Sequence, residues 1–349
     1  MRTGNRAFVS ASLRAGRDVL HVETRIERDP GDVLVVSLSP GCQVLECRGG
    51  DGSPMSWRHE EDRLTLAGSH GASSVRIAYA IPLGARVGLV PEQPWLARPA
   101  GRDYHVAGAT TRVIGEGGLI CGTDPHHGAP FVVAWPPGDG PRLRVEVRHG
   151  EVVATDRRAG SEVTRILRTL TGWLGPIDDV SVVDVAVPGA YAYSYPGVIA
   201  VHPGLLDFPA TLFGQYLPHE LSHQWFGNRV RFTGPGFLWP QECLPEALQA
   251  LYVRERWGSA AYDVITRSYL RQHDERLLQQ LFSVGPAERA HLSLDRYHDL
   301  LAVGTRRWLS AFQAGSRALH DVVRALAAEP AEFTGAQVAA LVGEAVVLP

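Results

Sequence analysis

Residues 219–246, HELSHQWFGNRVRFTGPGFLWPQECLPE, carry side chains that can bind a metal ion and activate water. His219 and His223 are four positions apart, so on a helix both imidazoles lie on one face and can hold one zinc ion. Glu220 lies beside the first histidine and is badly placed to be a third ligand. Its carboxylate suits a general base that takes a proton from a zinc-bound water.

A catalytic zinc site needs a third protein ligand and keeps its fourth position open. Glu242 is the candidate in this sequence. We expect the helix that carries the histidines to end at Gln224 to Phe226. Gly227 and the Gly-Pro-Gly at 234–236 break regular structure after it, and residues 239–256 are rich in helix formers. Two helices that fold back on each other would bring the Glu242 carboxylate to the two imidazoles.

The string HELSHQWFGN is followed by a glutamate three positions past a tryptophan, with eighteen residues between the second histidine and this glutamate. This pattern resembles the aminopeptidase N family of gluzincin zinc metallopeptidases. The resemblance covers about residues 160–310. It implies hydrolysis of peptide bonds, with one zinc ion per chain held by His219, His223 and Glu242. A zinc-activated water would attack the peptide bond, and Glu220 would act as the general base.

Composition excludes several other kinds of function. The chain has 349 residues, a formal net charge of −3 and no run of like charges, so we expect no binding to nucleic acid or to an anionic membrane surface. All 34 basic residues are arginine, which excludes a lysine Schiff base and a P-loop lysine. The four cysteines form no C-x-x-C pair and the first residues have no apolar core of signal-peptide length, so we expect a reduced, cytoplasmic enzyme.

Residues 1–155 predict an antiparallel β-sheet domain. Apolar and polar side chains alternate at 64–66, 75–79 and 143–147, and clusters of Gly, Pro and Asp between such segments predict turns. The segment TDPHHGAP at 123–130 has metal-binding residue types, but an exposed loop is the better interpretation. This domain shows no evident catalytic set of its own.

Residues 156–349 predict a mainly helical domain, so the fold class is α+β. Apolar residues from Val163 to Leu174 recur at helical spacing, with Ser161 as the N-cap and Gly175 at the end. We expect strands at 180–187 and 198–201 next, and further helices from Tyr262 onward. The resemblance implies that this domain is a thermolysin-like catalytic domain, in a short form without a helical carboxy-terminal domain.

The chain departs from the family pattern in GAYAYSYPG, residues 189–197, which we expect to form a turn before the second of these strands. Family members carry Gly-x-Met-Glu-Asn there; its backbone pairs with the substrate and its glutamate binds the free amino group. Ser194 and Tyr195 stand at the positions of the glutamate and the asparagine. Glu246 lies one helical turn past Glu242, where it could orient a metal ligand through a hydrogen bond, bind a substrate amine in place of the lost anchor, or simply be solvated.

Family members also place a tyrosine about sixty residues after the glutamate ligand, where its hydroxyl stabilises the oxyanion. Tyr297, in DRYHDLLAVG, is the candidate because it opens a predicted helix at that distance. Tyr252, Tyr262 and Tyr269 are the alternatives. Cys243 replaces the family's glycine after the glutamate ligand, and we expect it to pack near the metal rather than to react.

Three functions are compatible with the sequence. The first is a zinc peptidase of the aminopeptidase N type with altered recognition of the amino end. The second is an endopeptidase or amide hydrolase that matures one dedicated peptide, which Ser194 favours. The third is a non-catalytic binding protein on a peptidase scaffold. The expected partner is a peptide substrate, and the oligomeric state is not predicted.

Overall fold

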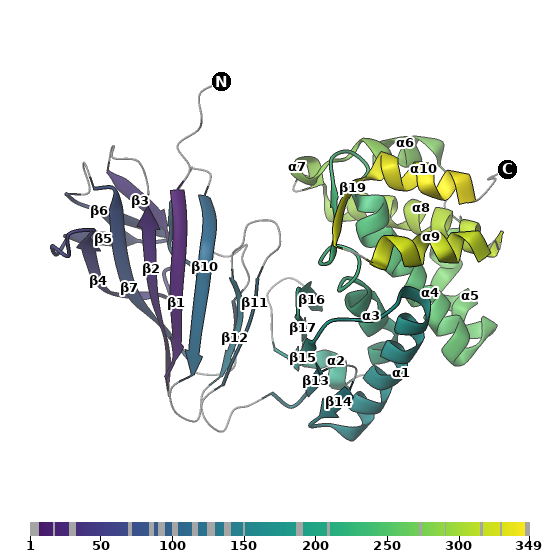
Figure 1. The fold of residues 1–349 in the computed structure, drawn as a ribbon, viewed down its shortest axis with the longest axis horizontal. Helices are drawn as coiled ribbons and strands as arrows, with labels where there is room; N and C mark the ends of the chain where they lie inside the picture. Colours follow the sequence, from purple (N-terminus) through teal and green to yellow (C-terminus); the bar gives the residue numbers. More distant parts are fainter. Residues whose placement is uncertain are drawn as a thin grey trace. The chain divides into compact units, whose positions relative to one another are not determined.

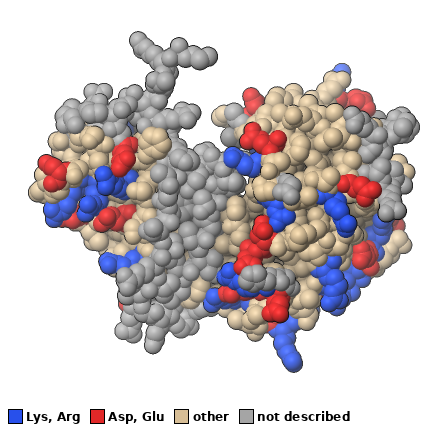
Figure 2. Space-filling model, in the orientation of Figure 1, with Lys and Arg blue, Asp and Glu red and all other residues tan. Residues whose placement is uncertain are grey.

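The computed structural model describes residues 7–16, 18–27, 33–68, 72–83, 87–89, 95–99, 104–113, 118–123, 130–135, 141–148, 151–185, 191–207, 210–271, 274–289, 291–314, 317–328 and 330–345 (Figure 1). The chain forms two compact units. The first comprises residues 1–142, 183–191 and 200–203, and the second comprises 143–182, 192–199 and 204–349. Acidic and arginine side chains lie interspersed on the face of each unit shown in Figure 2. None of the helices described here is long and apolar enough to cross a membrane.

The described residues of the first unit form three sheets. Their strands are β1 (Ala7–Ala15), β2 (Val19–Glu27), β3 (Leu34–Ser37), β4 (Gln43–Gly49), β5 (Trp57–Glu60), β6 (Arg63–Leu66), β7 (Ser74–Pro82), β8 (Val87–Leu89), β9 (Arg98–Pro99), β10 (Tyr104–Val113), β11 (Gly118–Thr123) and β12 (Pro130–Trp135). The strand orders are β10-β1-β2-β7-β4, β5-β6-β3-β9 and β11-β12-β8. Neighbours are antiparallel, as predicted, except that β1 and β10 run parallel.

The period-two patterns of the sequence mark the buried faces of these sheets. Side chains alternate between buried and exposed along all of β1, and the apolar positions at 64–66 and 75–79 are fully buried in β6 and β7. Tyr79 keeps its hydroxyl satisfied in this core, because it lies 3.2 Å from Thr24 Oγ1 and accepts the Ala97 N–H at 3.0 Å. Most of the TDPHHGAP segment, residues 124–129, lies outside the described residues.

The described residues of the second unit form a five-stranded sheet, a two-stranded sheet and helices. Its five-stranded sheet has the order β14-β13-β15-β17-β16, from β13 (Arg144–Arg148), β14 (Glu151–Ala154), β15 (Val180–Asp184), β16 (Ala192–Tyr195) and β17 (Val198–Val201). Its helices are α1 (Arg157–Leu174), α2 (Gly204–Asp207), α3 (Ala210–Ser222), the π-helix η1 (Trp239–Cys243), α4 (Leu244–Trp257), α5 (Ser259–Arg271), α6 (Glu275–Ser283), α7 (Pro286–Arg289), α8 (Leu294–Gln313), α9 (Arg317–Ala328) and α10 (Gly335–Ala345). A parallel pair, β18 (Val230–Thr233) and β19 (Ala331–Thr334), completes it.

This division differs from the predicted one in the place of two strands. The sequence pattern grouped β13 and β14 with the amino-terminal sheets, whereas in the structure they extend the sheet of the second unit. Alternation identifies a strand but not its neighbour, since any half-buried strand has the same period. The boundary between residues 155 and 156 stays a prediction.

The first long helix begins earlier than predicted. Asp156, not Ser161, caps α1, because its side chain accepts the Ala159 N–H at 2.7 Å. Ser161 lies inside the helix and donates to the Arg157 carbonyl at 2.8 Å. The helix ends at Gly175 as predicted, and its apolar face from Val163 to Leu174 is buried. The first turn contains Arg157 and Arg158, whose side chains do not belong to the apolar face. The apolar pattern therefore does not mark the start of the helix.

The π-helix that carries Glu242 is fixed by packing against α8. The Trp308 indole donates to the Trp239 carbonyl at 3.0 Å, and the two rings stack with centroids 4.5 Å apart. Cys243 is fully buried and faces Gly304 of α8, which has no side chain to fill that space. Cys243 is therefore a packing residue, in line with the sequence-based expectation. Short π-helices are frequent at functional sites, because they re-aim one side chain.

Gly304→Ala is expected to destabilise the fold by about 1–3 kcal/mol. A Cβ there would overlap the Cys243 sulfur and lie 2.8 Å from Leu281 Cδ2. Gly172→Ala is the matched control: a Cβ at this α1 glycine meets nothing within 4 Å, so alanine should stabilise by about 0.5–1 kcal/mol. Urea unfolding measures both. Changes of equal sign in the free energy of unfolding would contradict this packing. So would a loss of stability in Gly304→Ala that is no smaller when Cys243 is also replaced by alanine.

Candidate metal centre

The two histidines of the motif lie at the end of α3. The helix ends at Ser222, one residue before His223, rather than continuing to Phe226 as the sequence suggested. The His223 N–H still donates to the His219 carbonyl at 3.3 Å, so the helical turn between them is kept. Their Nε2 atoms lie 3.1 Å apart, and both side chains are nearly buried. The predicted pair therefore faces one point.

The chain turns sharply after His223, and a glycine makes this possible. Gly227 has φ 107°, a conformation that side chains with a Cβ rarely adopt. Its N–H donates to the Val230 carbonyl at 2.7 Å, which starts the path into β18. This geometry accounts for the glycine in HELSHQWFGN.

Glu242 brings its carboxylate to the histidines from η1. Its Oε2 lies 3.9 Å from His219 Nε2 and 3.7 Å from His223 Nε2. In the part of the chain that the structure describes, these three residues are the one group of His, Cys, Asp or Glu side chains arranged to hold a metal ion. The chain therefore folds back on itself as the sequence suggested: α3 brings the histidines, and η1 with α4 brings Glu242.

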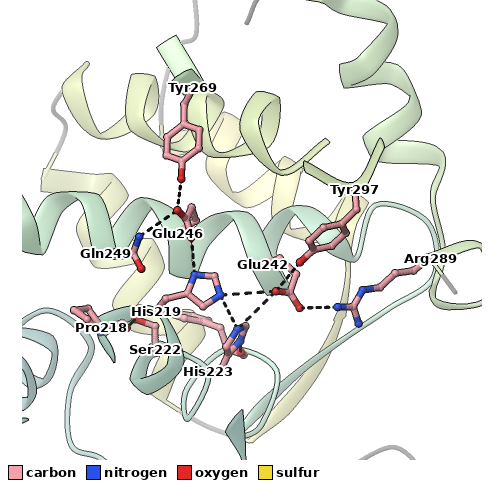
Figure 3. Close-up of polar contacts among 11 residues, drawn as sticks. Pro218, His219, Ser222, His223, Glu242, Glu246, Gln249, Tyr269, Arg289 and Tyr297 are labelled. Atoms are coloured by element: carbon pink, nitrogen blue, oxygen red, sulfur yellow. Dashed lines mark hydrogen bonds and ion pairs between the residues drawn. The ribbon is translucent and has the colours of Figure 1, made fainter. Parts of the chain in front are cut away.

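The other ring nitrogen of each histidine meets an acceptor, and Figure 3 shows the contact between His219 and Glu246. His219 Nδ1 lies 2.8 Å from Glu246 Oε2, and His223 Nδ1 lies 3.0 Å from the Phe226 carbonyl. An acceptor at Nδ1 places the ring proton there and leaves the Nε2 lone pair for a metal. Of the three possibilities considered for Glu246, the structure displays the contact that orients a ligand.

The donor set fits zinc. Two imidazole nitrogens and one carboxylate oxygen form a common catalytic zinc set, and donors about 2.0–2.2 Å from one tetrahedral ion lie roughly 3.3 Å apart. The donor distances here, 3.1, 3.7 and 3.9 Å, are close to that spacing. His219, His223 and Glu242 are therefore the residues that would hold the ion.

Electrostatics at the site couple the imidazoles to the carboxylates. Burial alone would lower the pKa of His219, but its contacts with Glu242 and Glu246 outweigh burial and raise this pKa well above its ordinary value. Burial would raise the pKa of Glu242, yet His219, His223 and Arg289 together hold it well below the usual range. Burial would also raise the pKa of Glu246, but its contacts with His219 and Tyr269 lower it, so both carboxylates are kept ionised, as a metal ligand and its orienting partner require.

Glu220 follows His219 on α3. The pKa of its carboxyl group is raised overall. Burial raises it most, the two histidines lower it in part, and Glu242 and Glu246 raise it further. No described side chain donates a hydrogen bond to this carboxylate. A base with a raised pKa and no such donor can accept a proton from water.

Tyr297 reaches the same centre from the first turn of α8. Its hydroxyl donates to Glu242 Oε2 at 3.2 Å, and burial together with Glu242 raises its pKa, so it stays protonated. The other three candidate tyrosines lie elsewhere: the hydroxyl of Tyr252 donates to Glu162, that of Tyr262 accepts from Gln313, and that of Tyr269 donates to Glu246. Among the four, Tyr297 alone contacts a candidate metal ligand directly.

Ser194 and Tyr195 lie on β16, at the edge of the sheet, where the sequence suggested a turn. Gln224, one residue past the second histidine, links this strand to the metal centre. Its Nε2 donates to Ser194 Oγ at 2.8 Å and to the Tyr195 carbonyl at 3.1 Å. An edge strand leaves backbone groups that an extended peptide can pair with.

Sequence reasoning missed Arg289. Its Nη2 lies 3.7 Å from Glu242 Oε1, the oxygen opposite the histidines, and its guanidinium lies over the Tyr297 ring, 5.5 Å from the centroid. Figure 3 shows Arg289 and Tyr297 meeting Glu242 on one side, while Glu246 meets His219 on the other. No local pattern marks this arginine, because its partners are far away in the sequence.

Glu246→Gln is expected to weaken zinc binding about 10–100-fold, the range typical of groups that orient a ligand histidine. The amide keeps the shape but removes the negative charge beside His219 Nδ1. Gln249→Ala is the control, because it removes a neutral donor to Glu246 at 3.2 Å and leaves the histidine contact in place. Competition with a zinc chelator measures both affinities. Equal affinities in the unchanged chain and in Glu246→Gln would contradict this role.

Neither a protein-family model nor a curated protein matches this sequence. Solved structures do resemble it. An M1 zinc metallopeptidase variant from Deinococcus radiodurans, bound to a Tyr-Ser-Ala substrate, matches with a TM-score of 0.53 and 14% identity over 99% of this chain and 92% of that one. A two-domain M1 zinc metallopeptidase variant bound to L-tryptophan matches with the same values. At this identity the likeness shows that the chain shares the fold of these M1 zinc metallopeptidases.

Proposed function

We propose that this chain is a zinc-dependent metallopeptidase of the aminopeptidase N type. The observation that carries the proposal is the meeting of His219, His223 and Glu242 at one point, with Glu220 and Tyr297 beside them. The shared fold with M1 zinc metallopeptidases supports it. In the proposal residues 156–349 form a thermolysin-like catalytic domain, and β13 and β14 extend its sheet.

The chemistry divides among the chain's own residues. Zinc held by the three ligands would act as a Lewis acid that polarises a carbonyl and makes water more acidic. Glu220 takes a proton from the attacking water and passes it to the departing amine. Tyr297 donates its hydroxyl proton in a hydrogen bond to the oxygen on which negative charge develops. Glu246 holds His219 in the tautomer that binds metal.

The peptide substrate is expected to lie along β16. Backbone pairing with this edge strand would position the scissile bond, and Gln224 keeps Ser194 and Tyr195 in place. Ser194 is neutral, so the ammonium of a free amino end meets no negative charge there. This feature favours a second candidate, a narrow-specificity endopeptidase or amide hydrolase.

Digestion of a mixed peptide library separates these functions. Half of the peptides carry free amino ends and half carry acetylated ends, and mass spectrometry identifies the products. Loss of single residues from free ends only establishes an aminopeptidase, and cleavage of blocked peptides establishes an endopeptidase. No cleavage by the zinc-loaded chain would count against a general peptidase and for a binding protein on a peptidase scaffold.

Tyr297→Phe is expected to lower kcat about a hundredfold or more with zinc content unchanged, since it removes one oxyanion donor. Tyr252→Phe is the matched control, because that hydroxyl contacts Glu162 and not the metal centre. Initial rates on one cleaved peptide compare the two variants. A large loss of kcat in Tyr252→Phe with no loss in Tyr297→Phe would show that Tyr297 is not the residue that stabilises the oxyanion.

The location of the enzyme is also part of the proposal. Cys42, Cys47 and Cys243 are unpaired and buried in the structure. Free thiols of this kind are typical of proteins in reducing compartments, which supports the cytoplasm.

A further inference from the structure

Arg289 places a positive charge beside a group of residues, His219, His223 and Glu242, that is arranged to bind a metal cation. Its guanidinium lies 3.7 Å from Oε1 of the ligand Glu242. Besides helping the two histidines to keep Glu242 ionised, a cation at this distance competes with a metal ion for the charge of the carboxylate. A role in holding zinc therefore does not by itself account for this arginine.

The position of Arg289 suits contact with a substrate. Its side chain is 43% exposed, whereas that of Glu242 is 11% exposed, so the guanidinium lies where the buried centre meets solvent. It also stacks on the ring of Tyr297, whose hydroxyl contacts the other oxygen of Glu242. A group bound by Arg289 would thus lie beside the reacting atoms.

The charges around the centre select for an anion at this place. Each nearby carboxylate already has a role: Glu242 as ligand, Glu246 on His219, and Glu220 as base. The strand β16 offers the neutral Ser194 and Tyr195. Together with zinc, Arg289 would repel an ammonium group and attract a carboxylate.

We propose that Arg289 is a specificity-determining residue that binds a carboxylate of the peptide substrate near the scissile bond. The guanidinium presents paired N–H donors in a planar fork that matches a carboxylate. The carboxylate can come from the free carboxyl end of a short peptide or from an acidic side chain. This inference rests on the proposed peptidase function, and its test separates the two.

Binding to a zinc-loaded Glu220→Gln chain tests the inference without turnover. The probes are Ala-Phe-Ala with a free carboxyl end against its amide, and acetyl-Ala-Phe-Asp-amide against acetyl-Ala-Phe-Asn-amide. Calorimetry is expected to show about tenfold tighter binding of the carboxylate in at least one pair. The pair that responds identifies the source. Arg289→Gln should reduce that ratio to about one, since the amide side chain cannot form a charged bond.

Arg296→Gln is the matched control. Arg296 has similar exposure, 39%, and contacts Asp299 and Gln280 rather than the metal ligands, so its loss should leave the ratio unchanged. Equal affinity for carboxylate and amide in both pairs would overturn the inference. The inference would also be overturned if Arg289→Gln weakened the binding of all four peptides by the same factor. That result would mean that Arg289 only positions Glu242 and does not recognise a carboxylate. Failure of the unchanged chain to hydrolyse any probe would count against the peptidase function instead.

Discussion

Glu220→Gln is expected to lower kcat by about 10²–10⁴-fold, the usual contribution of a positioned general base. The amide has nearly the shape of the carboxylate but cannot accept the proton of water. Because Glu220 is not a metal ligand, zinc content should stay at that of the unchanged chain. Single-turnover rates on a cleaved peptide, with zinc measured on the same sample, test this prediction.

The control for this change is Glu255→Gln, on the exposed face of α4. It removes one carboxylate of the same type without touching the centre, and its rate should equal that of the unchanged chain. A Glu220→Gln chain that retains full activity would contradict the assignment of the base. Loss of zinc along with activity would instead make Glu220 part of the metal site.

Glu242→Gln is expected to weaken zinc binding by more than about a hundredfold, the upper range for groups that merely orient a ligand. A neutral amide replaces the single anionic ligand, and only two histidines remain as strong donors. Activity at limiting zinc should be lost with the metal. Zinc affinity by chelator competition and activity across a zinc titration are the measurements.

The outcome at high zinc distinguishes a ligand from a base. A Glu242→Gln chain should recover part of its activity as zinc is raised, whereas Glu220→Gln should not recover at any concentration. Unchanged zinc affinity in Glu242→Gln would remove this residue from the ligand set. The same change also takes the negative charge from Arg289 and Tyr297, so it should lower the free energy of unfolding even without zinc.

The sequence was most informative where one local pattern decides structure. The four-residue spacing of His219 and His223 places both rings on one face, whether or not the helix continues. The apolar period from Val163 to Leu174 located a helix, although not its cap. Alternation located the strands at 64–66 and 75–79, because each has one buried face.

Contacts between segments that are far apart in the sequence could not be predicted from it. Tyr269 and Arg289 approach Glu246 and Glu242 from other helices, and no spacing relates them. The strand β16 was taken for a turn because AYSYPG has turn-forming residues, but pairing in the sheet decides its conformation. The choice of Tyr297 among four tyrosines needed the packing of α8, which depends on contacts such as Cys243 against Gly304.

The most direct test of a zinc peptidase is a zinc titration of the metal-free chain, with bound zinc and peptide hydrolysis followed together. Activity should rise in proportion to bound zinc and stop rising at one ion per chain, and Glu242→Gln should shift the whole curve to higher zinc. Hydrolysis at full rate in the metal-free chain would contradict a zinc peptidase. Tight binding of one zinc ion that Glu242→Gln leaves unchanged would contradict the proposed metal centre equally.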